Sequence, residues 1–176
     1  VDERNREFMN ELFLYLIKGS EKLDSNKGLL LYGPVGTGKS TILKIIQLYD
    51  RYSNGKDETG YYLSGGFPIE SATFISNQYT RKGVDGISKY DGLNGIALGI
   101  DEVGKEPRVK YFGSEMDIIQ YIIQSRYDNR RICKTFITTN MQPEEFEPKY
   151  GEYIADRINE LFNVIEIKGK SRRWKL

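Results

Sequence analysis

The length and charge of this chain limit what it can be. It has 176 residues, the size of one ordinary domain, and its 26 Lys and Arg against 25 Asp and Glu give a formal net charge of +1. This balance excludes a global basic field, so any nucleic-acid surface must be a local patch. The chain has no histidine and one cysteine, which excludes Ser-His triads, His-ligated zinc and an internal disulfide. Carboxylates, lysine, arginine, hydroxyls and bound metal remain for chemistry.

The single cysteine and the lack of long apolar runs indicate the cellular compartment in which the protein works. No apolar run approaches the ~20 residues of a membrane-spanning helix, and no cleavable signal segment stands in residues 1–20. Cys133 precedes a strand pattern, where a buried apolar role is expected. We therefore expect a protein of the reducing cytoplasm with no membrane partner. The sequence begins at Val1 and not at Met, as expected of a chain that lacks its N-terminal part.

Helical and strand patterns alternate along the chain, which is typical of a parallel sheet with helices on its faces. In the first half they predict a helix over residues 2–18, a polar loop over 20–27, a buried strand over 28–32, a helix over 39–49 and a long surface loop over 53–66. In the second half they predict a strand over 72–75, a charged and tyrosine-bearing segment over 77–91, a strand over 96–100, a helix over 114–127, a strand over 135–138, a helix over 152–162 and a strand over 164–167. The expected fold class is α/β with a five-stranded parallel sheet.

One stretch carries a strong signal for phosphate binding. Residues 33–40 satisfy G-x-x-x-x-G-K-[ST] between a buried strand and a helix, the setting that this motif requires. Its glycines let backbone N–H groups turn toward phosphates, Lys39 would reach the β- and γ-phosphates, and Ser40 would offer its hydroxyl to Mg²⁺. The alternative is a Gly-rich turn without a ligand. We expect ATP to bind at Gly33, Pro34, Val35, Gly36, Thr37, Gly38, Lys39, Ser40 and Thr41.

Polar residues follow two further predicted strands, at the edge where ligands bind in open α/β sheets. Asp101 would hold Mg²⁺ together with Ser40, and Glu102 would act as general base on the attacking water. Asn140 would contact the γ-phosphate or align the water. The alternatives are a solvated turn for the acidic pair and a turn cap for Asn140.

The order of these motifs resembles that of the AAA+ ATPases. The phosphate loop, the Ile-Asp-Glu-Val-Gly stretch at 100–104, the helix near 114–128, the Thr-Thr-Asn run ending at Asn140 and the segment 150–158 follow one another as in that family. The DnaC/DnaI helicase loaders and the IstB-like ATPases are most similar within it, over about residues 28–173. The resemblance implies a three-layer P-loop NTPase sandwich, in which the strand bearing Asn140 lies between the phosphate-loop strand and the Asp-Glu strand.

The resemblance also implies roles that the motifs alone do not assign. Arg157 falls on the arginine-finger position, which acts on the nucleotide of a neighbouring subunit in a head-to-tail ring or filament. With Lys39, Glu102 and Asn140 it completes the expected catalytic set. The sequence ends soon after the last predicted strand, so the helical lid of most AAA+ proteins is expected to be absent. We expect an N-terminal helix over residues 1–20 and the ATPase domain over 21–176.

Together these features predict an AAA+ module that binds ATP and Mg²⁺, hydrolyses ATP slowly, and assembles on single-stranded DNA with a replicative helicase as partner. An IstB-like ATPase, with duplex DNA and a transposase as partners, is an alternative that the sequence does not separate. The others are a superfamily 3 helicase, a small-molecule kinase and a non-catalytic ATP-binding scaffold. A kinase does not need the Asp-Glu pair and Asn140 together. Intact Lys39, Glu102 and Arg157 argue against a scaffold.

Two basic segments are candidates for nucleic-acid contact. In the segment between the second and third predicted strands, bases would stack on tyrosine while cations neutralise phosphates. Its residues are Tyr79, Arg81, Lys82, Lys89 and Tyr90. The tail carries Lys168, Lys170, Arg172, Arg173 and Lys175, with Trp174 among them. The alternatives are a solvated helix face and a disordered basic tail.

Overall fold

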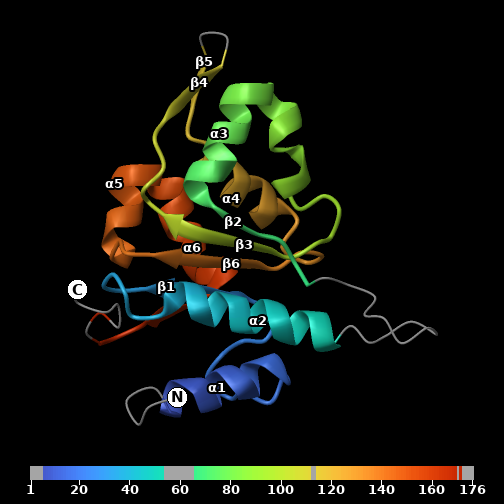
Figure 1. The fold of residues 1–176 in the computed structure, drawn as a ribbon, viewed down its shortest axis with the longest axis vertical. Coiled ribbons are helices and arrows are strands. Elements are labelled where there is room, and N and C mark those ends of the chain that lie inside the picture. Colours follow the sequence, from blue (N-terminus) through green and yellow to red (C-terminus); the bar gives the residue numbers. More distant parts are fainter. Residues whose placement is uncertain (1–5, 54–65, 112–113, 170, 172–176) are drawn as a thin grey trace, which may run out of the picture.

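Five parallel strands form the centre of the protein (Figure 1). The computed structural model describes residues 6–53, 66–111, 114–169 and 171. The strand order is β2-β3-β6-β1-β7. The strands are β1 (Gly28–Tyr32), β2 (Ile69–Ser71), β3 (Leu98–Val103), β6 (Thr135–Thr139) and β7 (Phe162–Glu166). β6 therefore lies between β1 and β3, as the AAA+ resemblance implies, and the expected fold class is confirmed.

Helices cover both faces of this sheet (Figure 1). One face carries α1 (Arg6–Leu16) and α2 (Lys39–Ser53), and the other carries α3 (Ala72–Lys82), α4 (Ile118–Asp128), α5 (Phe146–Tyr150) and α6 (Glu152–Leu161). Leu29 and Leu31 of β1 join the core beneath α1 and α2, whereas Leu30 joins the core on the opposite face. Successive strand residues point to opposite faces, so a central strand covered on both faces is apolar at every position.

The predicted strand over 72–75 is wrong, because these residues begin α3. The strand is the short β2 just before them. Ser71 ends β2 and caps α3, its Oγ accepting the Phe74 N–H at 3.1 Å. Ala72, Ile75 and Tyr79 then face the core at helical spacing. A short apolar run does not distinguish strand from helix, and here the cap and the longer helical period decide.

The predicted helix over 114–127 begins too early. Residues 114–116 form β5 (Ser114–Met116), which pairs in antiparallel fashion with β4 (Val109–Tyr111). Asp117 then caps α4, its carboxylate accepting the Gln120 N–H at 3.1 Å. Because a cap residue has non-helical backbone, the helix starts at Ile118.

The remaining predicted elements are present, some with shifted bounds: β3 spans 98–103 in place of the predicted strand over 96–100, and α2 continues to residue 53, four residues past the predicted helix over 39–49. The helix over 152–162 and the strand over 135–138 are confirmed as α6 and β6, and β7 starts two residues earlier than the predicted strand over 164–167. Residues 2–5 of the first predicted helix and residues 54–65 of the predicted surface loop lie outside the described residues. Within the described part of the chain, no helix is both long enough and apolar enough to cross a membrane.

The N-terminal helix packs on the rest of the domain. Leu12 and Tyr15 of α1 are 1% and 3% exposed and belong to the core beneath α2. The Tyr15 hydroxyl donates to Lys27 O at 2.6 Å, which ties the helix to the start of β1. The boundary between an N-terminal helix over residues 1–20 and an ATPase domain over 21–176 stays a prediction.

Candidate nucleotide-binding site

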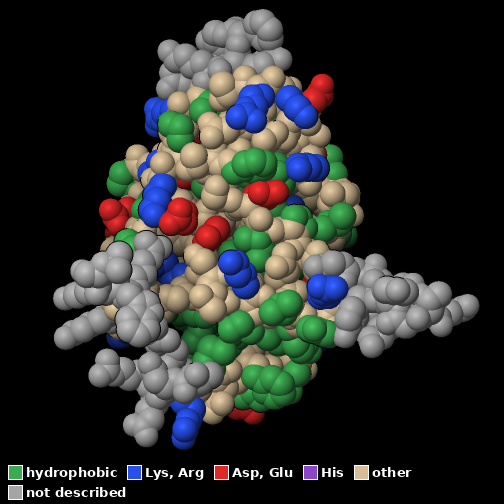
Figure 2. All heavy atoms as spheres, viewed as in Figure 1, with side chains coloured by type: hydrophobic (Ala, Val, Ile, Leu, Met, Phe, Trp, Pro, Cys, Tyr) green, Lys and Arg blue, Asp and Glu red, His purple; other side chains and the backbone are tan. Residues whose placement is uncertain are grey.

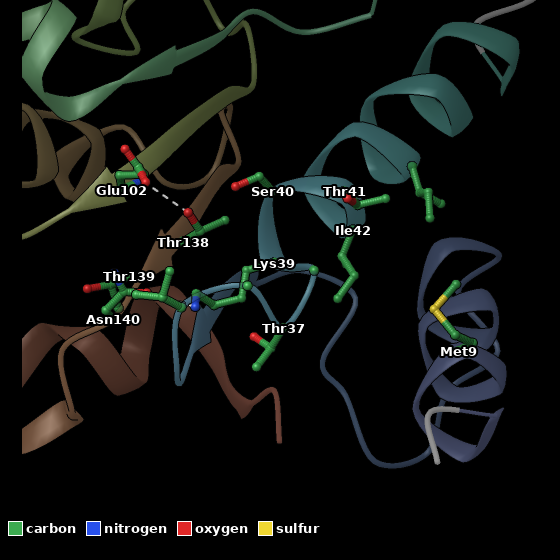
Figure 3. Close-up of a pocket in the computed structure, with 14 residues that line it drawn as sticks. Met9, Thr37, Lys39, Ser40, Thr41, Ile42, Glu102, Thr138, Thr139 and Asn140 are labelled. Carbon is green, nitrogen blue, oxygen red and sulfur yellow. Dashed lines mark hydrogen bonds between the residues drawn. The ribbon is translucent and has the colours of Figure 1, made fainter. Parts of the chain in front are cut away.

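The phosphate loop connects β1 to α2 and closes around Lys39 (Figure 3). Gly33 and Gly38 have backbone φ angles of +131° and +99°, values that residues other than glycine rarely adopt. Lys39 begins α2, and its ammonium donates to the loop carbonyls of Gly33 and Pro34 at 2.7 and 2.8 Å. The same ammonium donates to Asn140 Oδ1 at 2.9 Å. The loop therefore combines the backbone shape, the helix N-terminus and the cation that phosphate binding requires.

A cavity of about 530 Å³ opens beside this loop, and small-molecule sites have volumes of roughly 300–1,000 Å³. Its wall joins the loop and the first turns of α2 to Glu102 and to the end of β6 (Figure 3). Met9 of α1 and Ile42 and Ile45 of α2 also line it. The sequence carries no signal for Met9, whose place depends on how α1 packs. Ile45 follows Thr41 at helical spacing and could have been inferred.

Oxygen atoms suited to a magnesium ion meet at the start of α2. Ser40 Oγ donates to Asp101 Oδ1 at 2.9 Å, so the two predicted ligands are adjacent. Asp101 lies within β3, whose end is Val103, and not after the strand as predicted. Thr138 Oγ1 also donates to Asp101 Oδ1. Mg²⁺ binds through oxygen, with one or two protein carboxylates and the substrate phosphates. The residues present therefore fit this ion.

Glu102 lies in the wall of the cavity in an unusual backbone conformation. Its φ is +60°, which is uncommon for a residue other than glycine. Its carboxylate pairs with Lys105 Nζ at 2.7 Å, and both side chains are about half exposed. In this arrangement the carboxylate is held by a lysine of the following turn.

A buried carboxylate fixes that turn. Glu106 is 4% exposed, and its Oε2 accepts the Gly104 N–H at 2.8 Å. Its Oε1 accepts the Tyr150 hydroxyl from α5 and lies 3.5 Å from Lys149 Nζ. Burial and the neighbouring Glu106 charge raise the pKa of Tyr150 far above its usual value. The turn after Glu102 is thus anchored to the segment that follows Asn140.

Asn140 stands where the resemblance requires a γ-phosphate sensor. It follows β6, between the phosphate-loop strand and the Asp-Glu strand, and its amide oxygen accepts from Lys39. The alternative role as a turn cap is not what its side chain does here. The Gln142 N–H of that turn instead donates to Glu145.

Arg157 does not line the candidate nucleotide cavity. It lies on α6, and its Nη1 donates to Gln124 Oε1 of α4 at 3.1 Å. Its guanidinium carbon lies 3.0 Å from the ring centre of Tyr153 and 4.4 Å from that of Tyr127. Among the described residues it forms no ion pair with Asp156 or Glu160. Its position leaves the predicted action on a neighbouring subunit untested.

The predicted nucleic-acid segment over 79–90 is partly wrong. Tyr79 and Tyr90 are 3% and 1% exposed, so neither ring is available for stacking on bases. They pack in the core because α3 and the 3₁₀ turn Ser88–Tyr90 turn them inward. Arg81, Lys82 and Lys89 are exposed. Figure 2 shows several Lys and Arg side chains over the end of the molecule that carries α3, and others spread over the rest of the same face.

Most of the basic tail lies outside the described residues. Lys168 is described and pairs with Glu166, with its Nζ 3.3 Å from Glu166 Oε2. Lys170, Arg172, Arg173, Trp174 and Lys175 are not described. The tail's predicted contact with nucleic acid stays a prediction. Cys133 is buried as expected.

Comparisons with known proteins find similarity in structure. The chain matches no family model and no curated protein. The DnaC helicase loader superposes with a TM-score of 0.68 at 20% identity, over 96% of this chain and 92% of that one. DnaI superposes with a TM-score of 0.65 at 22% identity, over 98% of this chain and 86% of DnaI. The replication initiator DnaA bound to AMPPCP and single-stranded DNA gives 0.62 at 18%, over 97% of this chain and 48% of DnaA.

At such identities these superpositions establish the fold alone. The chain has the fold of the AAA+ P-loop NTPases, in the form that the DnaC and DnaI structures also have.

Proposed function

We propose that this chain is an ATP-binding and ATP-hydrolysing AAA+ module that acts on single-stranded DNA together with a replicative helicase, as a helicase loader does. The observation that carries the ATPase part is the meeting of Lys39, Ser40 and Asn140 around one cavity. Asp101 is hydrogen-bonded to Ser40 beside that cavity, although these residues come from three different strand ends. The DnaA structure with AMPPCP, a nucleotide, supports ATP as the ligand.

Each residue of this site has one task in the proposed reaction. Lys39 and the loop N–H groups bind the β- and γ-phosphates, and Asn140 orients the γ-phosphate or the water. Ser40 and Asp101 would hold Mg²⁺, which supplies positive charge to the phosphate oxygens. Glu102 leaves Lys105 and takes a proton from the attacking water.

Replacing Lys39 by alanine is expected to weaken ATP binding about 10- to 150-fold. Hydrogen bonds to a charged group contribute about 1.5–3 kcal/mol, and this ammonium is the cation inside the loop. Calorimetry with ATP and Mg²⁺ measures the change. Lys44→Ala, which removes an exposed lysine of the same helix, is the matched control and should bind like the parent. Equal affinity of Lys39→Ala and the parent would contradict the assignment.

The proposed contact with single-stranded DNA rests on exposed cations at the end of the molecule that carries α3. Arg81 and Lys82 are exposed in the last turn of α3, and Lys89 is exposed in the following 3₁₀ turn. The structural similarity to DnaA with bound single-stranded DNA supports this ligand. Because the tyrosines of this segment are buried, binding is proposed to come from phosphate neutralisation and not from stacking.

Charge reversal of Arg81 and Lys82 to glutamate is expected to weaken binding of a single-stranded oligonucleotide and to flatten its salt dependence. Each neutralised phosphate contributes about 0.7 to the slope of log affinity against log salt for single strands. Fluorescence anisotropy across a salt series measures both quantities. The double variant Lys22→Glu/Lys44→Glu is the control, because it makes the same change in net charge at two exposed lysines outside α3. The surface is excluded if the two double variants bind alike, and a preference for duplex DNA would favour the transposition ATPase.

A further inference from the structure

The acidic pair of the candidate site lies on a break in the sheet register. Ile100 pairs with Ile137 and Val103 pairs with Thr139, so three steps along β3 correspond to two steps along β6. Asp101 and Glu102 together therefore oppose one residue, Thr138. A register break of this kind is a β-bulge, which is rare in parallel pairs and re-aims side chains near active sites. In a regular strand the two carboxylates would point to opposite faces.

The side-chain hydroxyl of Thr138 forms hydrogen bonds across this break, where the backbone ladder between β3 and β6 is interrupted. Its Oγ1 accepts the Glu102 N–H at 3.0 Å, the bond drawn in Figure 3. The same hydroxyl donates its proton to Asp101 Oδ1, the oxygen that also accepts from Ser40. One hydroxyl thus holds the backbone of the residue assigned as base and the carboxylate assigned to the metal. Thr138 is 1% exposed, so water does not readily replace it.

We propose that Thr138 is a positioning residue of the ATPase site: its hydroxyl orients Asp101 toward the magnesium position beside Ser40 and holds the β3 bulge that presents Glu102. This inference rests on the proposed function. It assigns to Thr138 no contact with the nucleotide. The role acts through Asp101 and Glu102, and it needs the hydroxyl and not the methyl group of the threonine.

The neighbouring threonine offers a comparison within the same strand end. Thr139 is equally buried, and its Oγ1 donates to Val103 O at 2.7 Å and accepts the Met141 N–H at 3.0 Å. It makes as many hydrogen bonds as Thr138, but neither partner is an acidic residue of the site. Loss of either hydroxyl removes two buried hydrogen bonds, whereas only the Thr138 hydroxyl contacts the metal-binding carboxylate.

The test measures how Mg²⁺ changes ADP affinity in the parent, Thr138→Val, Thr138→Ser and Thr139→Val proteins. Calorimetry in excess EDTA gives the metal-free affinity, and a Mg²⁺ series gives the gain from the metal. ATP turnover and melting temperature are measured in parallel for the two Thr138 variants, and melting temperature alone for Thr139→Val. Mutation of groups that orient metal ligands costs about 10–100-fold in metal affinity or activity. Thr138→Val is therefore expected to raise the half-saturating Mg²⁺ concentration about 10–100-fold and to lower turnover by a similar factor, with ADP affinity in EDTA within about 2-fold of the parent.

The variants separate a positioning role from a structural one. Thr138→Ser should restore the Mg²⁺ response and turnover, and Thr139→Val should lower the melting temperature without changing the Mg²⁺ response. A Thr138→Val protein with the parent's Mg²⁺ response overturns the inference while leaving the proposed function intact. So does a Thr139→Val protein with the same loss of Mg²⁺ response. A parent that binds no ADP, with or without Mg²⁺, overturns the proposed function and this inference with it.

Discussion

Mixed in equal amounts, Arg157→Ala and Lys39→Ala proteins are expected to recover ATP hydrolysis that neither variant shows alone. Arg157 lies outside the candidate nucleotide cavity, where it contacts Gln124 and two tyrosine rings on α4 and α6. If it serves a neighbouring nucleotide, the Lys39→Ala subunit supplies the arginine and the Arg157→Ala subunit supplies the intact site. An arginine finger contributes about 10³–10⁵ in rate in P-loop enzymes. Head-to-tail contacts of this kind produce rings or filaments.

Phosphate release at a series of protein concentrations measures this effect. If Arg157 acts on a neighbouring nucleotide, parent activity should rise more than linearly with concentration, because a lone subunit would then lack the arginine. The matched control mixes Arg157→Ala protein with the Lys39→Ala/Arg157→Ala double variant, which brings no intact arginine, and it should stay inactive. If the first mixture is also inactive where the parent assembles, Arg157 acts as a structural residue between Tyr127 and Tyr153.

Glu102→Gln is expected to keep ATP binding and to reduce hydrolysis about 10²–10⁴-fold, the usual contribution of general acid–base catalysis. The amide preserves the size of the side chain but cannot accept the proton of the attacking water. The Glu102 N–H bond to Thr138 does not involve the side chain, so the bulge should persist in the variant. Calorimetry gives ATP affinity, and phosphate release under saturating ATP gives turnover.

Lys105 provides the control for this experiment. Glu102→Gln also removes the ion pair with Lys105, so a loss of turnover has two explanations. Lys105→Gln removes the same pair and leaves the carboxylate in place. Turnover in Lys105→Gln should remain within about 10-fold of the parent, since exposed ion pairs contribute little. Unchanged turnover per bound ATP in Glu102→Gln would mean that another group activates the water.

Local sequence patterns were enough to predict those features that depend on neighbouring residues alone. The run 28–32 is apolar at every position and is a central strand, and the loop after it has the glycines and Lys39 that its backbone shape needs. The same patterns failed at 72–75, where a short run predicted as a strand starts a helix because Ser71 caps it. They failed again for Tyr79 and Tyr90, which a charged segment suggests are exposed and which the fold buries.

The sequence by itself determined the phosphate loop and the α/β class. It could do so because glycine conformation, helix N-termini and strand hydrophobicity act over a few residues. Only the tertiary structure decided that Met9 lines the cavity and that Thr138 bridges the β3 bulge. It also decided that Arg126, 1% exposed, donates to carbonyls of Tyr90, Ile96 and Lys134 at the opposite edge of the sheet. Each of these depends on which distant segments meet when the sheet assembles, and no spacing along the chain encodes that meeting.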